Sequence, residues 1–162
     1  MKTLLLVRQA KSSRDELALP DKERPLNDRG MRDAPRMGER LARQDVKPDL
    51  ILSSPAERAL ATAQIIAEKL DYVVTDIVVD ERLYSAESGA LLEVIRNLGE
   101  KPKCVMLFGH NPELTELAHG LSSKITDMPT CAVAEFIFDA KSWSNIGKQE
   151  PTKVALYRPK DS

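Results

Sequence analysis

Short apolar runs alternate with amphipathic stretches along the whole chain. Runs of four to seven residues between polar or turn residues are typical of buried strands, whereas apolar residues at three- and four-residue spacing are typical of helices. Strands that alternate with helices indicate an α/β fold. We therefore predict strands at residues 4–7, 49–52, 73–79, 104–108, 132–138 and 153–157, with Asp76 interrupting the third and the last two at the sheet edge.

Helices are predicted between these runs, wherever apolar residues share one face. Two of them have the same start signal: a small polar residue followed by proline. Ser54 is expected to cap one of these helices, with Pro55 in its first turn and Glu57 completing a capping box. Asn111 and Pro112 start the other helix in the same way. The expected helices cover residues 29–43, 55–70, 88–98 and 112–121.

The predicted helix at residues 29–43 carries an arginine stripe opposite its apolar face. The simplest interpretation is a solvated surface, and the alternative is a docking stripe for an acidic partner protein. Pro35 fits only the first turn of a helix, so the helix is expected to begin near Asp33 or Ala34, or to be kinked. The apolar face holds Ala34, Met37, Gly38 and Leu41, and the stripe holds Arg29, Arg32, Arg36, Arg40 and Arg43.

Three predicted strands end close to a cationic or imidazole side chain. Arg8 follows the first strand, Arg58 lies in the first turn after the second, and His110 follows the fourth. Ligands of open α/β sheets bind outside the carboxyl ends of the strands, so we expect these three groups to form one pocket. Two guanidinium groups suit a phosphoryl group, and we predict that phosphate, sulfate or vanadate binds there.

The motifs at these strand ends resemble those of the histidine phosphatase superfamily, and of its SixA-type phosphohistidine phosphatases in particular. The resemblance runs from residue 1 to about residue 138, and the order of the motifs makes it specific. The matching segments are Leu-Val-Arg-Gln-Ala at 6–10, Lys-Ser-Ser at 11–13, Arg-Pro-Leu-Asn-Asp-Arg-Gly at 24–30, Ser-Ser-Pro-x-x-Arg-Ala at 53–59, Gly-His-Asn-Pro at 109–112 and Met-Pro-Thr-Cys-Ala at 128–132.

The resemblance implies a three-layer sandwich like that of phosphoglycerate mutase, with a mostly parallel sheet between helices. It also implies hydrolysis through a phosphohistidine intermediate, without metal or cofactor. Arg8, Arg58 and His110 are then the phosphate-binding residues, and His110 also stabilises charge in the reaction. Several branches place the proton donor near Glu81, although a surface ion pair is the simpler interpretation of that residue.

Ser12 and Ser13 follow the first motif directly. Their hydroxyl groups can donate to a phosphate oxygen, and the alternative is that they are solvated loop residues.

Gln9 occupies the position of the nucleophilic histidine in the family motif. The chain has only two histidines, His110 and His119, so no neighbouring histidine can take its place. A carboxamide cannot form a stable phosphoenzyme, and loss of the nucleophile removes the covalent route. We therefore expect greatly reduced or abolished turnover with phosphate binding retained. Gln9 fits equally an engineered variant of an active hydrolase and a natural degenerate member.

Composition narrows the functional classes further. The 162 residues carry a formal net charge of −1, which provides no general attraction to nucleic acid or membranes. We expect one domain at residues 1–158, a loose tail at 159–162, and a cytoplasmic location. No His, Cys or Asp cluster has metal-ligand spacing. An unrelated α/β domain is disfavoured because no glycine-rich phosphate loop follows a predicted strand.

Two functional interpretations remain from the sequence. The first is a phosphatase-family protein for phosphohistidine or another phosphoprotein, with low or absent activity as written. The second is a pseudophosphatase that recognises phosphoproteins without turnover. A small phosphorylated molecule is a further possible substrate, but a domain with few insertions near the pocket fits a phosphoprotein better.

Overall fold

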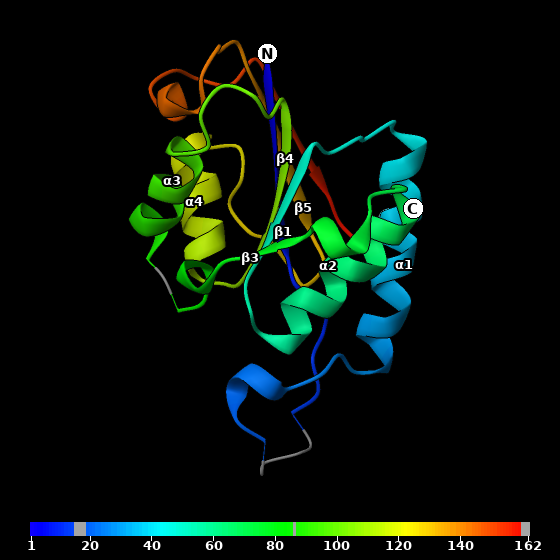
Figure 1. Cartoon of the computed structure of the whole chain (residues 1–162). Coiled ribbons are helices and arrows are strands. Elements are labelled where there is room, and N and C mark those ends of the chain that lie inside the picture. Colours follow the sequence, from blue (N-terminus) through cyan, green and yellow to red (C-terminus); the bar gives the residue numbers. More distant parts are fainter. Residues whose placement is uncertain (15–18, 86, 160–162) are drawn as a thin grey trace.

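A six-stranded mixed sheet forms the centre of the protein (Figure 1). The computed structural model describes residues 1–14, 19–85 and 87–159. Strands β1 to β4 are mutually parallel, and β5 runs antiparallel to both β1 and β6. The strand order is β3-β2-β4-β1-β5-β6, with β1 at Lys2–Arg8, β2 at Leu50–Ser53, β3 at Val78–Val79, β4 at Cys104–Gly109, β5 at Val133–Phe138 and β6 at Lys153–Tyr157.

Helices cover both faces of this sheet. Helices α1 (Asp28–Arg43) and α2 (Glu57–Lys69) pack on one face, and α3 (Ser88–Arg96) and α4 (Glu113–Leu121) pack on the other (Figure 1). This arrangement confirms the α/β sandwich and mostly parallel sheet predicted from the sequence. Within the described residues, no helix is long and apolar enough to cross a membrane.

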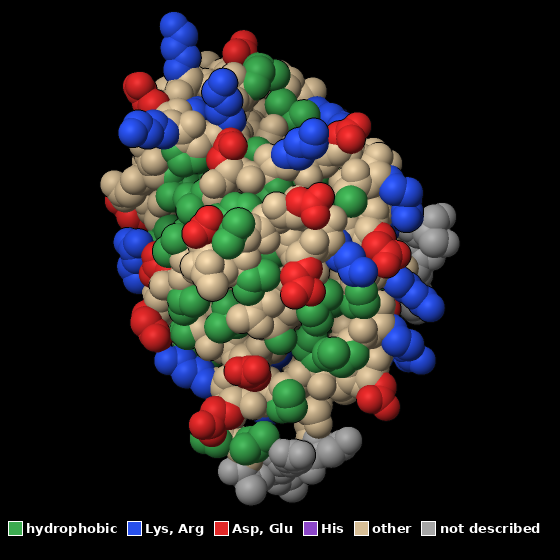
Figure 2. All heavy atoms as spheres, turned by 45° about the vertical axis from the view of Figure 1, so that its right-hand side comes forward, with side chains coloured by type: hydrophobic (Ala, Val, Ile, Leu, Met, Phe, Trp, Pro, Cys, Tyr) green, Lys and Arg blue, Asp and Glu red, His purple; other side chains and the backbone are tan. Residues whose placement is uncertain are grey.

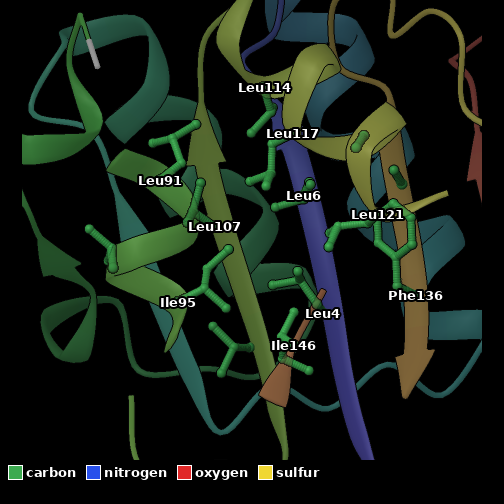
Figure 3. Packing of buried hydrophobic residues seen from close by; sticks show 14 of the residues in the cluster. Leu4, Leu6, Leu91, Ile95, Leu107, Leu114, Leu117, Leu121, Phe136 and Ile146 are labelled. Atoms are coloured by element: carbon green, nitrogen blue, oxygen red, sulfur yellow. The ribbon is translucent and has the colours of Figure 1, made fainter. Parts of the chain in front are cut away.

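Strand β1 supplies side chains to both halves of the core. Leu4 and Leu6 belong to the cluster beneath α3 and α4, whereas Leu5 and Val7 belong to the cluster beneath α1 and α2. Figure 3 shows the first cluster, where Leu4 and Leu6 face leucines of α3 and α4. Successive residues of a strand point to opposite faces, so one short apolar run is buried on both sides.

The register of the parallel strands brings their carboxyl ends to one level. Arg8 of β1 is opposite Gly109 of β4, and Ser53 of β2 is opposite Phe108. The residues that follow these strands therefore start at the same edge of the sheet. In Figure 1 this edge is at the bottom, where the segment after β1 also lies.

Helix α1 runs from Asp28 to Arg43, close to the predicted range 29–43. The later start near Asp33 or Ala34, one of the two alternatives that Pro35 suggested, was wrong. Asn27 caps the helix, and its side chain accepts a hydrogen bond from the Gly30 amide at 2.9 Å. Pro35 lies inside the helix. The proline costs one backbone hydrogen bond, but the Asn27 cap and the buried apolar face allow the helix to start about two turns before Pro35.

Two predicted helix starts also differ from the structure. Helix α2 begins at Glu57 with Ala56 as its N-cap, and Ser54 instead contacts His110. Helix α4 begins at Glu113, although the Asn111 side chain still accepts a hydrogen bond from the Thr115 amide at 3.1 Å. In both cases a few non-helical residues lie between the end of the strand and the first turn of the helix, and the predicted cap residue lies among them.

The predicted strand at residues 73–79 is mostly replaced by a short helical turn. Residues Val74–Asp76 form a 3₁₀ turn, and only Val78 and Val79 pair with β2. Both valines are exposed, as expected for a short edge strand. The helix predicted at residues 88–98 ends at Arg96. The tail expected at residues 159–162 lies outside the described residues except for Pro159.

Gly30 provides a test of how α1 packs against the segment after β1. A Cβ atom at Gly30 would lie 2.2 Å from the Lys11 carbonyl oxygen. We expect Gly30→Ala to lower the free energy of unfolding by roughly 1–3 kcal/mol, measured by urea denaturation, because backbone must move. The control is Gly120→Ala in α4, which meets nothing within 4 Å and should be neutral or stabilising. Equal effects of both changes would contradict this packing.

Candidate active site

A small polar pocket lies at the carboxyl ends of β1, β2 and β4. Its volume is about 150 Å³, and five cationic side chains contribute to its wall. The structure brings the predicted Arg8, Arg58 and His110 together in this pocket, with Gln9 beside them. The lining residues are Arg8, Gln9, Lys11, Ser12, Arg14, Arg24, Arg58, His110, Asn111 and Thr130.

Arg8 is the last residue of β1, and a backbone carbonyl group fixes the position of its guanidinium group. Its Nη1 donates to the Met128 carbonyl oxygen at 2.9 Å. Its Nε is buried and has no hydrogen-bond partner among the described residues. Burial lowers the pKa of Arg8 below its ordinary value, which reflects the cost of keeping this charge away from water. A buried donor beside other cations favours an anionic ligand.

Arg58 lies in the first turn of α2, as predicted, and its side chain is buried. Its Nη1 donates to the Asp21 carbonyl oxygen at 2.8 Å, and its Nη2 donates to Asp21 Oδ2 at 3.1 Å. Each of these nitrogens contacts the segment that follows β1, so an anion must use the remaining N–H donors of Arg58 or compete with Asp21.

Asp21 connects three of the side chains around the pocket. Its Oδ1 accepts from Arg24 Nε at 3.1 Å and from Arg24 Nη2 at 2.9 Å. Its Oδ2 accepts from the Tyr84 hydroxyl at 2.6 Å, in addition to Arg58. The Tyr84 hydrogen bond, followed by the contacts with Arg24 and Arg58, holds the pKa of Asp21 far below its usual range. Asp21 is therefore ionised and fixes two arginines of the site.

His110 lies between Gln9 and Ser54. Its Nδ1 is 3.1 Å from Gln9 Oε1, and its Nε2 is 2.7 Å from Ser54 Oγ. With the amide oxygen as acceptor, Nδ1 carries the proton and Nε2 accepts from the Ser54 hydroxyl. The Tyr84 ring stands edge-on to the imidazole, with 5.7 Å between centroids. Both ring nitrogens thus have a protein partner.

The surroundings of His110 favour its neutral form. Burial, followed by the positive charge of Arg58, lowers its pKa from 6.5 to about 4. The imidazole is consequently uncharged at neutral pH, and the positive charge of the pocket comes from arginine and lysine. For His110 to stabilise charge as a protonated imidazole, an anion would have to lie close enough to raise this pKa.

Ser12, Ser13 and Glu81 differ in their placement relative to the pocket. Ser12 lines the pocket, and its hydroxyl accepts from Arg24 Nη1 at 2.7 Å. The backbone amide of Ser13 donates to Pro25 O, and its carbonyl oxygen accepts from Arg24 Nη1 at 3.2 Å. Glu81 stands apart from the pocket in an exposed ion pair of 3.0 Å with Lys22. This placement matches the simpler interpretation of Glu81 and gives it no contact with the pocket.

Sequence reasoning assigned no site role to several residues that the fold brings here. Lys11, Arg24, Asn111 and Thr130 all lie in segments that match the family motifs, so the resemblance contained a signal for them. Ser54 also lies in a matching segment, at 53–59, but was assigned a helix cap, whereas Asp21 and Tyr84 had no such signal. They reach the site only because distant segments meet at this edge of the sheet. The last lining residue without an assigned role is Arg14.

The arrangement suits binding of a tetrahedral dianion more than covalent chemistry. Guanidinium groups in fixed positions can bind phosphoryl oxygens without a metal ion. Gln9 lines the pocket, but its amide nitrogen has no basic lone pair and its oxygen contacts His110. A nucleophile at this position is therefore missing, while the cationic surroundings are present.

The depressed pKa of His110 predicts how stability changes with pH. The unfolded chain takes up a proton near pH 6.5, whereas the folded protein does so only near pH 4. The contribution of His110 to the free energy of unfolding should therefore be fully present above pH 6.5. It should be lost as the pH falls towards 4, which lowers the free energy of unfolding by up to ~3 kcal/mol. Urea denaturation between these pH values measures the effect. His110→Asn should remove this part of the slope, and an unchanged slope would contradict the interpretation.

Comparison with known proteins identifies relatives of this chain. Residues 4–103 match the model of the histidine phosphatase superfamily (branch 1). An uncharacterized chloroplastic protein of Arabidopsis thaliana is 32% identical over 148 residues, which cover 86% of this chain and 68% of that protein. An uncharacterized protein of Mycobacterium tuberculosis is 33% identical over 117 residues, covering 72% of this chain and 70% of that protein.

Solved structures show the same architecture. A SixA-type structure from Agrobacterium tumefaciens has a TM-score of 0.81 and 25% sequence identity, and the match covers 95% of this chain and 97% of that one. The protein histidine phosphatase SixA complexed with tungstate has a TM-score of 0.82 at 23% identity, with 97% of each chain covered. These findings agree with the motif order, and the chain belongs to the histidine phosphatase superfamily.

Proposed function

We propose that this protein binds the phosphoryl group of phosphohistidine, or of another phosphorylated protein residue, and that Gln9 leaves it with little or no turnover. The observation that carries the proposal is the position of Gln9, which lines the cationic pocket and contacts His110 at 3.1 Å. Binding groups surround the place where the family has its nucleophile. The pocket thus keeps the groups that recognise a phosphoryl group and lacks the group that performs the covalent step.

The size of the pocket supports a phosphoprotein rather than a small metabolite. Ligand pockets that enclose a whole small molecule usually have volumes of about 300–1,000 Å³. The volume of this pocket is about 150 Å³, enough for a phosphoryl group and little of what carries it. The carrier of the phosphoryl group therefore remains largely outside. A side chain on a protein surface meets this requirement.

A second function, a phosphoprotein-binding module without any turnover, is favoured by the contacts of His110. Both nitrogens of this imidazole are engaged, by Gln9 and by Ser54. A base held in this way is poorly placed to activate water directly. Binding would then be the whole activity, and phosphate release would not follow.

Arg58 tests the binding half of the proposal. Loss of a charge-assisted donor costs roughly 1.5–3 kcal/mol, so Arg58→Ala should weaken binding of vanadate by about 10- to 100-fold. Isothermal titration calorimetry measures the affinity. The matched control is Arg82→Ala, because Arg82 is exposed and pairs with Asp80 away from the pocket. Equal vanadate affinities of wild type and Arg58→Ala would contradict a phosphoryl site here.

Gln9→His tests the catalytic half. An imidazole at this position can accept the phosphoryl group, so hydrolysis of an aryl phosphate should rise by several orders of magnitude, whereas KM should change far less. Phosphorus NMR should then detect a phosphoramidate. Gln9→Asn is the control, since it changes the side chain without adding a nucleophile, and it should show no gain. Unchanged turnover in Gln9→His would favour the binding-module function.

A further inference from the structure

A second concentration of arginine lies on α1, outside the pocket. We define the arginine groove as the hollow of about 660 Å³ between α1 and the end of β6. Six of the twelve arginines in the sequence line it, and four others line the phosphate pocket. Arginine is thus concentrated in two places. The groove residues are Arg29, Arg32, Asp33, Arg36, Met37, Glu39, Arg40, Arg43, Arg158 and Pro159.

The positive charge of the arginine groove is only partly neutralised. Among the described residues that line it, the carboxylates are Asp33 and Glu39. Asp33 pairs with Arg29 at 3.5 Å, and Glu39 pairs with Lys69 of α2 at 3.3 Å. In the part of the chain that the structure describes, no ion pair forms at Arg32, Arg36 or Arg43, all of which are exposed.

The groove has a fixed wall at its far end. Arg40 Nη1 donates to the Arg158 carbonyl oxygen at 2.9 Å, and the Arg40 guanidinium stacks at 5.0 Å over the Tyr157 ring. This contact joins α1 to the end of β6. Figure 2 shows Lys and Arg side chains along the right-hand margin, on the side of the molecule that carries α1 in Figure 1.

The spacing of the arginines places their charges in a line along α1. They recur along α1 at intervals of three, four, four and three residues, so each lies next to another arginine on the helix surface. Like charges at these spacings destabilise a helix by roughly 0.2–0.5 kcal/mol per pair. The stripe is about 21 Å long, at 1.5 Å per residue between Arg29 and Arg43.

The first turn of α1 packs against the segment that follows β1 and lines the phosphate pocket. Gly30, next to Arg29, packs against the backbone of Lys11, which lines that pocket. The Asn27 amide also donates to the Lys11 carbonyl oxygen at 3.0 Å. Helix α1, which carries the arginine groove, is thus in contact with a residue that lines the phosphate pocket.

We propose that the arginine groove is a docking surface for an acidic helix of a partner protein, with carboxylates facing the arginines along α1. Arginine suits this partner because its planar group binds carboxylates in pairs of hydrogen bonds. A nucleic acid is the weaker candidate: the net charge of the chain is −1 and its pI is about 6.2, whereas nucleic-acid-binding domains commonly have a pI above about 9. The docking surface does not depend on turnover or on Gln9.

The test uses a defined peptide as the probe. A fluorescein-labelled alanine-based helical peptide, with glutamates at the same spacing as the arginines, should bind the protein in fluorescence anisotropy. Its affinity should fall as salt rises above about 0.15 M. The same peptide with glutamine in place of glutamate should not bind. Equal binding of the two peptides would overturn the proposal, because charge would then play no part.

Two double variants with the same charge change locate the surface. Arg32→Glu with Arg36→Glu should weaken peptide binding by about tenfold or more, since two guanidinium contacts become repulsive. Lys141→Glu with Lys148→Glu, at exposed positions in another hollow, should change it by less than about twofold. Similar losses in the two variants would overturn the assignment to α1.

Two further measurements separate this proposal from the alternatives. Vanadate affinity of the Arg32→Glu/Arg36→Glu protein should equal that of wild type, which shows an intact fold and an intact phosphate pocket. A large loss of vanadate affinity would overturn the separation of groove and pocket. Tighter binding of a duplex DNA of similar charge, or of anionic lipid vesicles, with the same dependence on Arg32 and Arg36 would overturn the choice of an acidic protein.

Discussion

The parallel pairing of β4 with both β1 and β2 is the constraint on which the candidate site depends. Hydrogen bonds along these ladders fix the three strands in register, so that β1 and β4 end opposite each other at Arg8 and Gly109. The segments that follow β1, β2 and β4 therefore all leave the sheet at the same edge. Arg8, Arg58 and His110 are far apart in sequence, and the register makes them neighbours. Core packing on both faces of β1 opposes a shift of its register, because a slip of one residue would move every side chain of the strand to the other face of the sheet.

Such a concentration of positive charge needs a compensating group, and Asp21 provides it. Its carboxylate accepts hydrogen bonds from Arg24, Arg58 and Tyr84, so the two guanidinium groups are held before any ligand arrives. Preorganisation of this kind lowers the cost of ordering side chains on binding. The same contact also means that an anion shares Arg58 with Asp21. Asp21 thus both neutralises part of the positive charge and holds the two arginines in place.

The network of Gln9, His110 and Ser54 gives the pocket its chemical character. The Gln9 oxygen orients the imidazole from one side and Ser54 contacts it from the other. Burial among cations keeps that imidazole neutral at physiological pH, with a pKa of about 4. The positive charge of the pocket therefore comes from arginine and lysine side chains, whose charge does not depend on pH in this range. The position that holds the nucleophilic histidine in the family motif thus carries a carboxamide beside a neutral imidazole.

Local patterns in the sequence determined the layers of the fold, because strand and helix periodicities depend only on neighbouring residues. They also determined that Arg8, Arg58 and His110 follow strand ends, and the motif order showed the absence of histidine at position 9. The tertiary structure alone decided the contacts of Asp21 with Arg58 and Tyr84, which join residues 37 and 63 positions apart. Polar residues in loops have no periodicity that reveals such partners. Ser54 shows the reason most clearly: its local context predicts a helix cap, but its hydroxyl lies 2.7 Å from an imidazole 56 residues away.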